Sequence, residues 1–143
     1  MHEIPKNNLI DANPSALDFW IRLTRTYTET LRRIDARLSN IHGLSFGDFA
    51  ILYHLKHAHE SRLRRTDLAE LLGLTISAVT RSLLPLEKIG LVDRQSNPND
   101  ARVGYARLTQ AGDQLFSNAS ETAEVACKET LQAILNYCQW STS

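Results

Sequence analysis

Three side chains able to contact the edge of a DNA base lie within five positions of one another, namely Ser77, Thr80 and Arg81. The guanidinium of Arg81 can donate two hydrogen bonds to a guanine edge, which is worth about 1–3 kcal/mol of discrimination. Ser77 and Ala78 are small, so the backbone around them can approach the floor of a groove closely. An ordinary amphipathic helix with a solvated face fits the same residues equally well, because such helices are common.

A second set of polar residues that could contact DNA lies near position 100. Asp100 and Arg102 follow the turn-forming run Ser96-Asn97-Pro98-Asn99. Arg102 can enter a narrow minor groove, where the potential is most negative, and Asp100 can hold its guanidinium in one pose by hydrogen bonding. The alternative interpretation of this pair is a weak, exposed ion pair within a loop.

Two short helices joined by a glycine turn are predicted to position the first group. Thr66 is predicted as the N-cap of the first helix, and Gly73 as its end because glycine adopts a positive φ at low cost. Thr75 is predicted to cap the second helix, so that the pair forms a helix-turn-helix. The residues predicted to be buried on the second helix recur every three or four positions and are Ile76, Val79, Leu83 and Leu86.

A β-hairpin is predicted to carry the second group. Residues 91–94 begin one strand, and residues 103–108 form the returning strand, which is rich in β-formers at its ends. The hairpin would stand beside the two helices as a wing, and residues 63–65 are expected to pair beside it as a short strand. Thr66, Thr75 and Arg94 are expected to contact phosphates or to support the hairpin.

The order of these motifs resembles the MarR family of bacterial transcription regulators over about residues 44–112. The motifs that carry the resemblance are Thr80-Arg81, Leu86-Glu87-Lys88-Ile89-Gly90-Leu91-Val92-Asp93-Arg94, Asp100-Ala101-Arg102 and Leu108-Thr109-Gln110-Ala111-Gly112. The resemblance implies a homodimeric repressor or activator that binds double-stranded DNA at a pseudo-palindromic operator and is often released by small aromatic or phenolic ligands. Members usually carry a further C-terminal helix, which would begin near Ser143.

The whole chain is expected to form one mainly α-helical domain with a small β-hairpin wing. Residues 13–41 are predicted as a helix for dimerisation or support, with Asn13 as N-cap and Pro14 in its first turn. Its apolar positions approach a heptad seam and are Trp20, Leu23, Tyr27, Leu31, Ile34, Leu38 and Ile41. Residues 44–108 form the winged lobe, and residues 109–140 a C-terminal helical region for dimerisation, capped by Thr109.

Within the lobe, Ser45-Phe46-Gly47-Asp48 resembles a capping box and starts a helix to about His59. The residues predicted to be buried on that helix are Phe49, Leu52, Tyr53 and Leu55. A ligand pocket is predicted where the long N-terminal helix meets the lobe, with Trp20, Tyr27, Phe46, Phe49 and Tyr53 as candidate walls. The same aromatic residues also suit a plain hydrophobic core.

The net charge of the 143-residue chain is zero, which alone argues against a nucleic-acid binder. The distribution of charge argues the other way, because residues 61–107 hold eight basic residues and five acidic ones. Concentrated arginine suits phosphate contact and predicts salt-dependent binding. No stretch approaches the ~18 apolar residues of a membrane span, and the N-terminus lacks the apolar core of a signal peptide, so we expect a cytoplasmic protein.

Other chemistries are less well supported by the residues. His54 and His57 are spaced for zinc on a helix but lack a convincing third ligand, so we expect neither a metal nor another cofactor. Cys127 and Cys138 are eleven residues apart, or ~16 Å along a straight helix, too far for a disulfide within it. No nucleophile elbow or phosphate loop appears, so an enzyme is not expected. The alternatives are a thiol- or metal-responsive regulator and a helical protein-interaction module.

Overall fold

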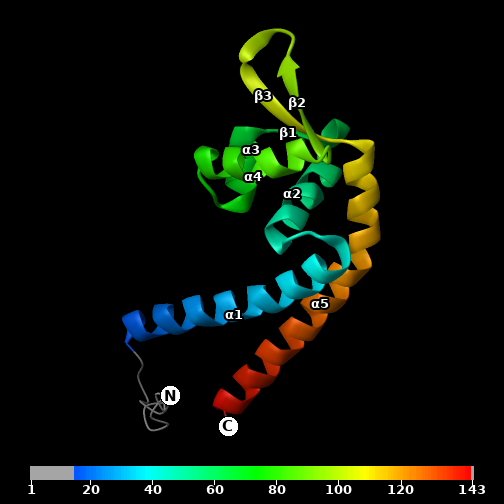
Figure 1. Cartoon of the computed structure of the whole chain (residues 1–143). Coiled ribbons are helices and arrows are strands. Elements are labelled where there is room, and N and C mark those ends of the chain that lie inside the picture. The colour runs from blue at the N-terminus through cyan, green and yellow to red at the C-terminus, as the bar shows by residue number, and fades with distance from the viewer. Residues whose placement is uncertain (1–14, 143) are drawn as a thin grey trace.

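A winged lobe rests on two long helices in the computed structural model, which describes residues 15–142 and all of their side chains except those of 101 and 137–142 (Figure 1). Along the chain the elements are α1 (Ala16–His42), α2 (Phe46–His57), a 3-10 turn (His59–Ser61), β1 (Arg62–Arg64), α3 (Arg65–Leu72), α4 (Ile76–Lys88), β2 (Val92–Asn97), β3 (Asp100–Leu108) and α5 (Gln110–Thr142). The predicted fold class is confirmed.

Helix α1 is capped by Ser15, whose side chain accepts a hydrogen bond from the backbone N–H of Asp18 at 3.2 Å. The predicted start at Asn13 and Pro14 lies outside the described residues. The predicted seam is buried only in its second half, at Ile34 and Leu38. The side chains of its first half are exposed in the described part of the chain.

Helix α2 begins with the predicted capping box. Ser45 Oγ accepts from the Asp48 N–H at 3.0 Å, and Asp48 Oδ2 accepts from the Ser45 N–H at 3.2 Å. Asp35 of α1 accepts a further hydrogen bond from the N–H of Phe46 at 2.6 Å, which fixes the start of α2 against α1. Phe49 is buried as predicted, but the predicted burial of Tyr53 is wrong, because its side chain is 45% exposed.

The helix-turn-helix forms from α3 and α4. Gly73 ends α3 with φ of 66°, and Thr75 Oγ1 accepts from the Ala78 N–H at 3.1 Å, so both predictions are confirmed. The prediction of Thr66 as N-cap is wrong. Strand β1 runs directly into α3, so Arg64 occupies the cap position with an extended backbone and no side-chain cap bond. Ile76 was predicted to be buried and is instead 51% exposed.

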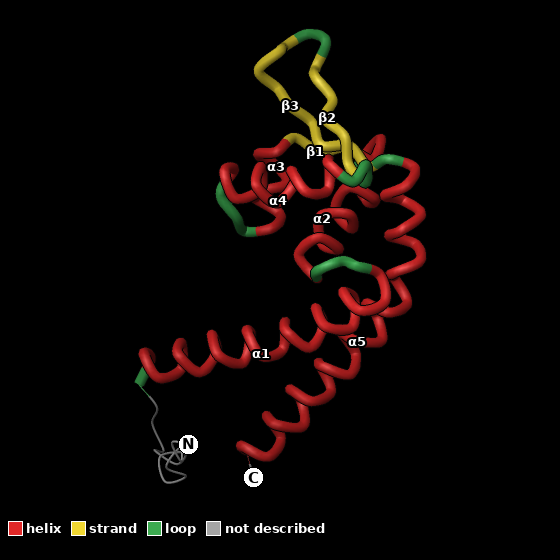
Figure 2. Tube along the Cα trace, in the orientation of Figure 1, coloured by secondary structure: helices red, strands yellow, loops and turns green. Residues whose placement is uncertain are grey.

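The wing is a three-stranded antiparallel sheet in the order β1-β3-β2 (Figure 2). In its register Gln95 and Arg64 both stand opposite Tyr105, one on each side of β3. Strand β3 begins at Asp100, earlier than predicted, so Asp100 and Arg102 lie at its start rather than in a loop. The hairpin projects beyond the helices of the lobe (Figure 1).

Helix α5 joins the lobe to α1. Thr109 caps it as predicted, since Thr109 Oγ1 accepts from the Gly112 N–H at 3.0 Å. Lys56 of α2 pairs with Asp113 of α5 at 2.6 Å, and further along α5 Glu129 pairs with Arg37 of α1. The core extends from this junction into the helix-turn-helix, and its fully buried side chains include Leu38, Leu44, Leu52, Leu55, Leu68 and Val79.

No single helix among residues 15–142 has the length and hydropathy needed to span a membrane; α3 and α4 meet those criteria only when taken together, and the two are bent by 103°.

Candidate nucleic-acid interface

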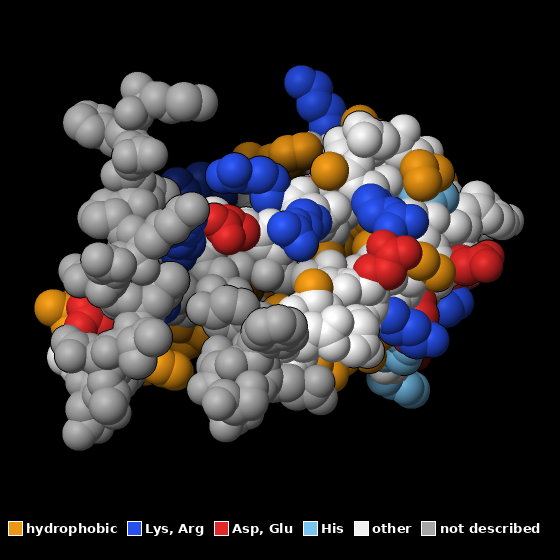
Figure 3. Space-filling model, turned by 90° about the horizontal axis from the view of Figure 1, so that it is seen from below, with side chains coloured by type: hydrophobic (Ala, Val, Ile, Leu, Met, Phe, Trp, Pro, Cys, Tyr) orange, Lys and Arg blue, Asp and Glu red, His pale blue; other side chains and the backbone are white. Residues whose placement is uncertain are grey.

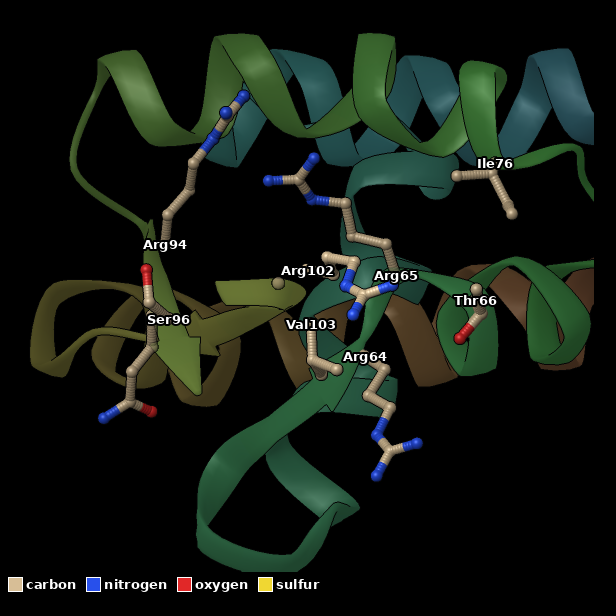
Figure 4. Close-up of a pocket in the computed structure, with 10 residues that line it drawn as sticks. Arg64, Arg65, Thr66, Ile76, Arg94, Ser96, Arg102 and Val103 are labelled. Carbon is tan, nitrogen blue, oxygen red and sulfur yellow. The ribbon is translucent and has the colours of Figure 1, made fainter. Parts of the chain in front are cut away.

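A basic hollow of about 610 Å³ separates the wing from the start of the helix-turn-helix (Figure 4). It is lined by Arg64, Arg65, Thr66, Ile76, Arg94, Gln95, Ser96, Arg102, Val103 and Gly104. These residues come from the end of β1, the first turn of α3, the first residue of α4 and both strands of the hairpin. We call this feature the wing hollow.

The arginines of the wing hollow differ in how strongly they are already paired. Arg94 forms an ion pair with Glu87 of α4 at 2.9 Å, which ties the hairpin to the recognition helix. Arg102 has a loose pair with Asp100 at 3.6 Å and is otherwise exposed to solvent. Arg65 extends across β3, since a β-carbon at Gly104 would lie 3.6 Å from its Nη2. Among residues 15–142, the structure gives Arg65 no acidic partner.

The predicted pairing of Asp100 with Arg102 takes a specific form. The carboxylate accepts a hydrogen bond from the backbone N–H of Arg102 at 3.0 Å, besides its looser contact with the guanidinium. The carboxylate therefore shapes the backbone at the start of β3 more than it fixes the guanidinium. The Arg102 side chain remains available to a phosphate or a groove, and the exposed pair adds little stability.

Tyr105 of β3 contacts two arginines at β1, Arg62 and Arg64. A hydrogen bond with Tyr105 raises the pKa of Arg64, while the guanidinium of Arg62 lies 4.7 Å from the centre of the Tyr105 ring. Next along the strand, hydrogen bonds from Arg107 lower the pKa of Asp93 and keep that carboxylate ionised. Arg107 is thereby neutralised, whereas Arg64 retains its charge beside the wing hollow.

The outward face of α4 adjoins the wing hollow. Ser77 and Arg81 are exposed, as is Lys88 in the last turn, while Ala78 and Thr80 are half-buried on the flanks. Val79, Leu83 and Leu86 are buried on the opposite face. The helix therefore presents small polar residues and one arginine to solvent near its N-terminus, as the spacing predicts.

The structure brings part of the predicted DNA-binding set together. Thr66, Arg94 and Arg102 line the wing hollow, whereas Thr75 serves as a helix cap. Arg64 and Arg65 also line it and were not among the predicted site residues. Their signal in the sequence is the basic run Arg62-Leu63-Arg64-Arg65 directly before Thr66, which predicts a short strand and adds to the local positive charge but does not place either side chain at the site.

The five predicted pocket residues fall into two separate groups. Phe46 and Phe49 stack in the lobe, and Phe49 stacks in turn on Phe116 of α5 with ring centres 5.1 Å apart. The ring centres of Tyr53 and Phe116 are 6.3 Å apart. Trp20 and Tyr27 are exposed on the first half of α1. Fifteen residues of helix, or about 22 Å of rise, separate Trp20 from Asp35, which holds the start of α2.

The described residues offer little support for a metal site or for a reactive thiol. His57 Nδ1 is hydrogen-bonded to the carbonyl of Tyr53 at 2.8 Å, and the described side chains, which end at residue 136, include no group of three that could hold a metal ion. Cys127 is half-buried, and burial raises the pKa of its thiol, with a smaller contribution from Glu124. The Cys138 side chain lies outside the described part of the chain.

The thiol of Cys127 is expected to react slowly in the folded protein, because a raised pKa leaves little of the reactive thiolate at neutral pH. In a Cys138→Ser variant, the rate of reaction with an aromatic disulfide reagent should rise several-fold when the protein is unfolded in concentrated urea. Equal rates in the folded and unfolded protein would show that Cys127 is reactive and would favour a thiol-responsive regulator.

Comparison with known proteins relates the lobe to one protein family. Residues 44–103 match the model of the MarR family. The chain is 34% identical over 89 residues to the HTH-type transcriptional regulator YdgJ of Bacillus subtilis, a match that covers 62% of this chain. The matched segment spans 53% of YdgJ, about half the length of that relative.

Two solved structures share the fold. Sco3205, a MarR family transcriptional regulator from Streptomyces coelicolor solved in complex with DNA, aligns with a TM-score of 0.77 at 24% identity, covering 91% of this chain and 83% of that one. The regulator BldR from Sulfolobus solfataricus aligns with a TM-score of 0.70 at 28% identity, covering 81% of each chain. Residues 44–103 thus resemble the MarR family of transcriptional regulators, and the chain shares the winged-helix fold of these solved regulators.

Proposed function

We propose that this protein is a transcriptional regulator that binds double-stranded DNA sequence-specifically as a homodimer, and that it is a repressor released by a small aromatic or phenolic ligand. The observation that carries the DNA-binding part is the wing hollow, in which Arg64, Arg65 and Arg102 lie beside the exposed start of α4. A concentration of guanidinium groups next to a helix that can enter a groove suits a polyanionic duplex.

The geometry suggests how the duplex is held. With α4 in the major groove, Ser77, Thr80 and Arg81 would face base edges, and the wing would carry Arg102 to the adjacent minor groove. The sugar-phosphate strand that separates these two grooves would then pass through the wing hollow, against Arg65 and Thr66. Sco3205, which has the same fold, was solved in complex with DNA, and this supports the proposal that the present chain binds DNA.

A homodimer is supported by an uncovered apolar surface on α1. Its exposed hydrophobic side chains are Leu17, Phe19, Trp20, Ile21, Leu23 and Tyr27. Helix α5 also exposes Leu131 and Leu135. Figure 3, which views the molecule from below, shows hydrophobic side chains among basic ones on this side. Such a surface is costly to leave in water. Two lobes joined through it would place their recognition helices ~34 Å apart on a pseudo-palindromic operator.

The ligand part of the proposal rests on the aromatic residues where α2 meets α5. Tyr53 and His57 are exposed beside Phe116, with the Tyr53 and His57 rings 4.4 Å apart. Suppose that a planar ligand binds here only when the lobe is displaced along α5, and that this displaced form does not bind DNA. The ligand would then shift the population toward the displaced form and lower the affinity for DNA. Salicylate is a suitable probe, and release of bound duplex by millimolar salicylate would support this part.

A fluorescence-anisotropy titration against duplex from the region upstream of its own gene, at two salt concentrations, tests the DNA-binding part. We expect binding that survives random competitor DNA and weakens steeply as salt rises, because several phosphates are neutralised. Binding that competitor abolishes, or that does not depend on salt, would instead favour the protein-interaction module.

The Arg81→Ala variant is expected to weaken operator binding by about 1–3 kcal/mol per half-site. The same loss is expected for Arg81→Lys if Arg81 reads a base, because lysine keeps the charge but lacks the planar fork that donates two hydrogen bonds. Anisotropy at one salt concentration measures both variants. Full affinity in Arg81→Lys would reassign Arg81 to phosphate contact.

A further inference from the structure

Ile76 is an apolar side chain in a cationic setting. It is the first residue of α4 and the one member of the predicted buried stripe that the fold leaves exposed, at 51%. It lines the wing hollow together with Arg65 and Thr66 (Figure 4). About half of this side chain is therefore accessible to a partner.

The helical geometry explains why Ile76 faces the wing hollow. At 100° per residue, Ile76 lies in line with Thr80 and Glu87, on the flank of α4 next to the buried stripe. Glu87 pairs with Arg94 of β2 at 2.9 Å, which shows that this flank faces the wing. The wing therefore stands opposite Ile76, with the hollow between them.

The surroundings of Ile76 restrict what can cover it. Arg64, Arg65, Arg94 and Arg102 line the same hollow, so an apolar protein surface would bring no compensating negative charge. A DNA strand supplies that charge through its phosphates. The thymine C5-methyl is also the one apolar group that base edges present in the major groove. A duplex thus matches both the cations and the isoleucine.

We propose that Ile76 contacts a thymine C5-methyl next to the backbone held in the wing hollow, and so selects thymine at one position of each half-site. This inference rests on the proposed DNA binding and adds a specificity determinant to it. Burial of one methyl group predicts about a fourfold gain in affinity per half-site. Ser77 and Arg81, by contrast, would recognise bases by hydrogen bonding.

The test begins with duplexes selected from a random pool by the wild-type protein. Each thymine of the selected sequence is then replaced by deoxyuridine, which removes the methyl group and leaves the hydrogen-bonding edge unchanged. Affinities of the wild type, Ile76→Ala and Ile89→Ala are measured by anisotropy. Ile89 is a matched control, because it is an exposed isoleucine at the other end of α4 and does not line the hollow.

We expect one deoxyuridine position per half-site to weaken the wild type and Ile89→Ala about fourfold, and to leave Ile76→Ala unchanged. The proposal is overturned if no position has this effect, or if Ile76→Ala keeps the same dependence on the methyl group. Failure of the selection to enrich any sequence is a different result, since it would overturn the proposed sequence-specific function itself. Circular dichroism verifies that each variant is folded.

Discussion

Replacing Gly112 by alanine is expected to destabilise the protein by about 3 kcal/mol, because there is no room for a β-carbon at this position. A β-carbon there would lie 2.1 Å from the carbonyl oxygen of Leu91 and 2.7 Å from a methyl group of Leu108. The Leu91 carbonyl cannot easily move away, since it accepts hydrogen bonds from the Thr109 N–H at 3.1 Å and from Thr109 Oγ1 at 3.0 Å.

Urea unfolding followed by circular dichroism measures this effect, at one fixed protein concentration because the proposed dimerisation would add to the apparent stability. The matched control is Gly47→Ala in α2. A β-carbon there would make an ordinary contact of 3.7 Å with Ser45 Oγ, and alanine should stabilise the helix by about 0.5–1 kcal/mol. A Gly112→Ala variant as stable as the wild type would show that the start of α5 can shift away from Leu91.

A double variant, Trp20→Glu with Leu23→Glu, is expected to be monomeric and to lose at least about 100-fold in operator affinity. Trp20 is 63% exposed and Leu23 44% exposed, so neither contributes much to the core of one chain. Two carboxylates on this surface would have to be desolvated in a dimer, which costs more than the apolar contact supplies. Each lobe would then bind its half-site alone.

Sedimentation velocity and anisotropy measure the two expected effects. Trp20→Phe with Leu23→Ile is the matched control, since it keeps both side chains apolar and should stay dimeric. Urea unfolding of the glutamate variant should be independent of protein concentration. A glutamate variant that remains a dimer would mean that the exposed half of α1 is not the interface, and the exposed Leu131 and Leu135 of α5 would be tested next.

The sequence by itself determined the features whose causes are local. The caps at Ser45, Thr75 and Thr109 were predictable, because each joins a side-chain oxygen to an N–H three residues further along the chain. Gly73 was predictable because a positive φ is cheap only for glycine. The turn formers near residue 98 likewise placed the hairpin, although not the early start of β3.

Burial was decided by the tertiary structure. Periodicity gives the direction of a side chain about its helix axis, but it does not show whether another element covers that direction. Ile76 and Tyr53 have the spacing of buried residues, yet no described element covers them fully. The seam of α1 is regular throughout, but only Ile34 and Leu38 are buried, on the part of α1 that packs against α5.

The candidate site shows the same division. Arg81 and Ser77 could be assigned from one helix, because the buried stripe beside them defines the outward face. Arg64 and Arg65 could not be assigned, since their place depends on the pairing of β1 with β3, two segments about forty residues apart in the chain. The sequence thus determined which local structures form. Only the packing of distant segments decided which side chains meet in the wing hollow and which apolar surface is left for a partner.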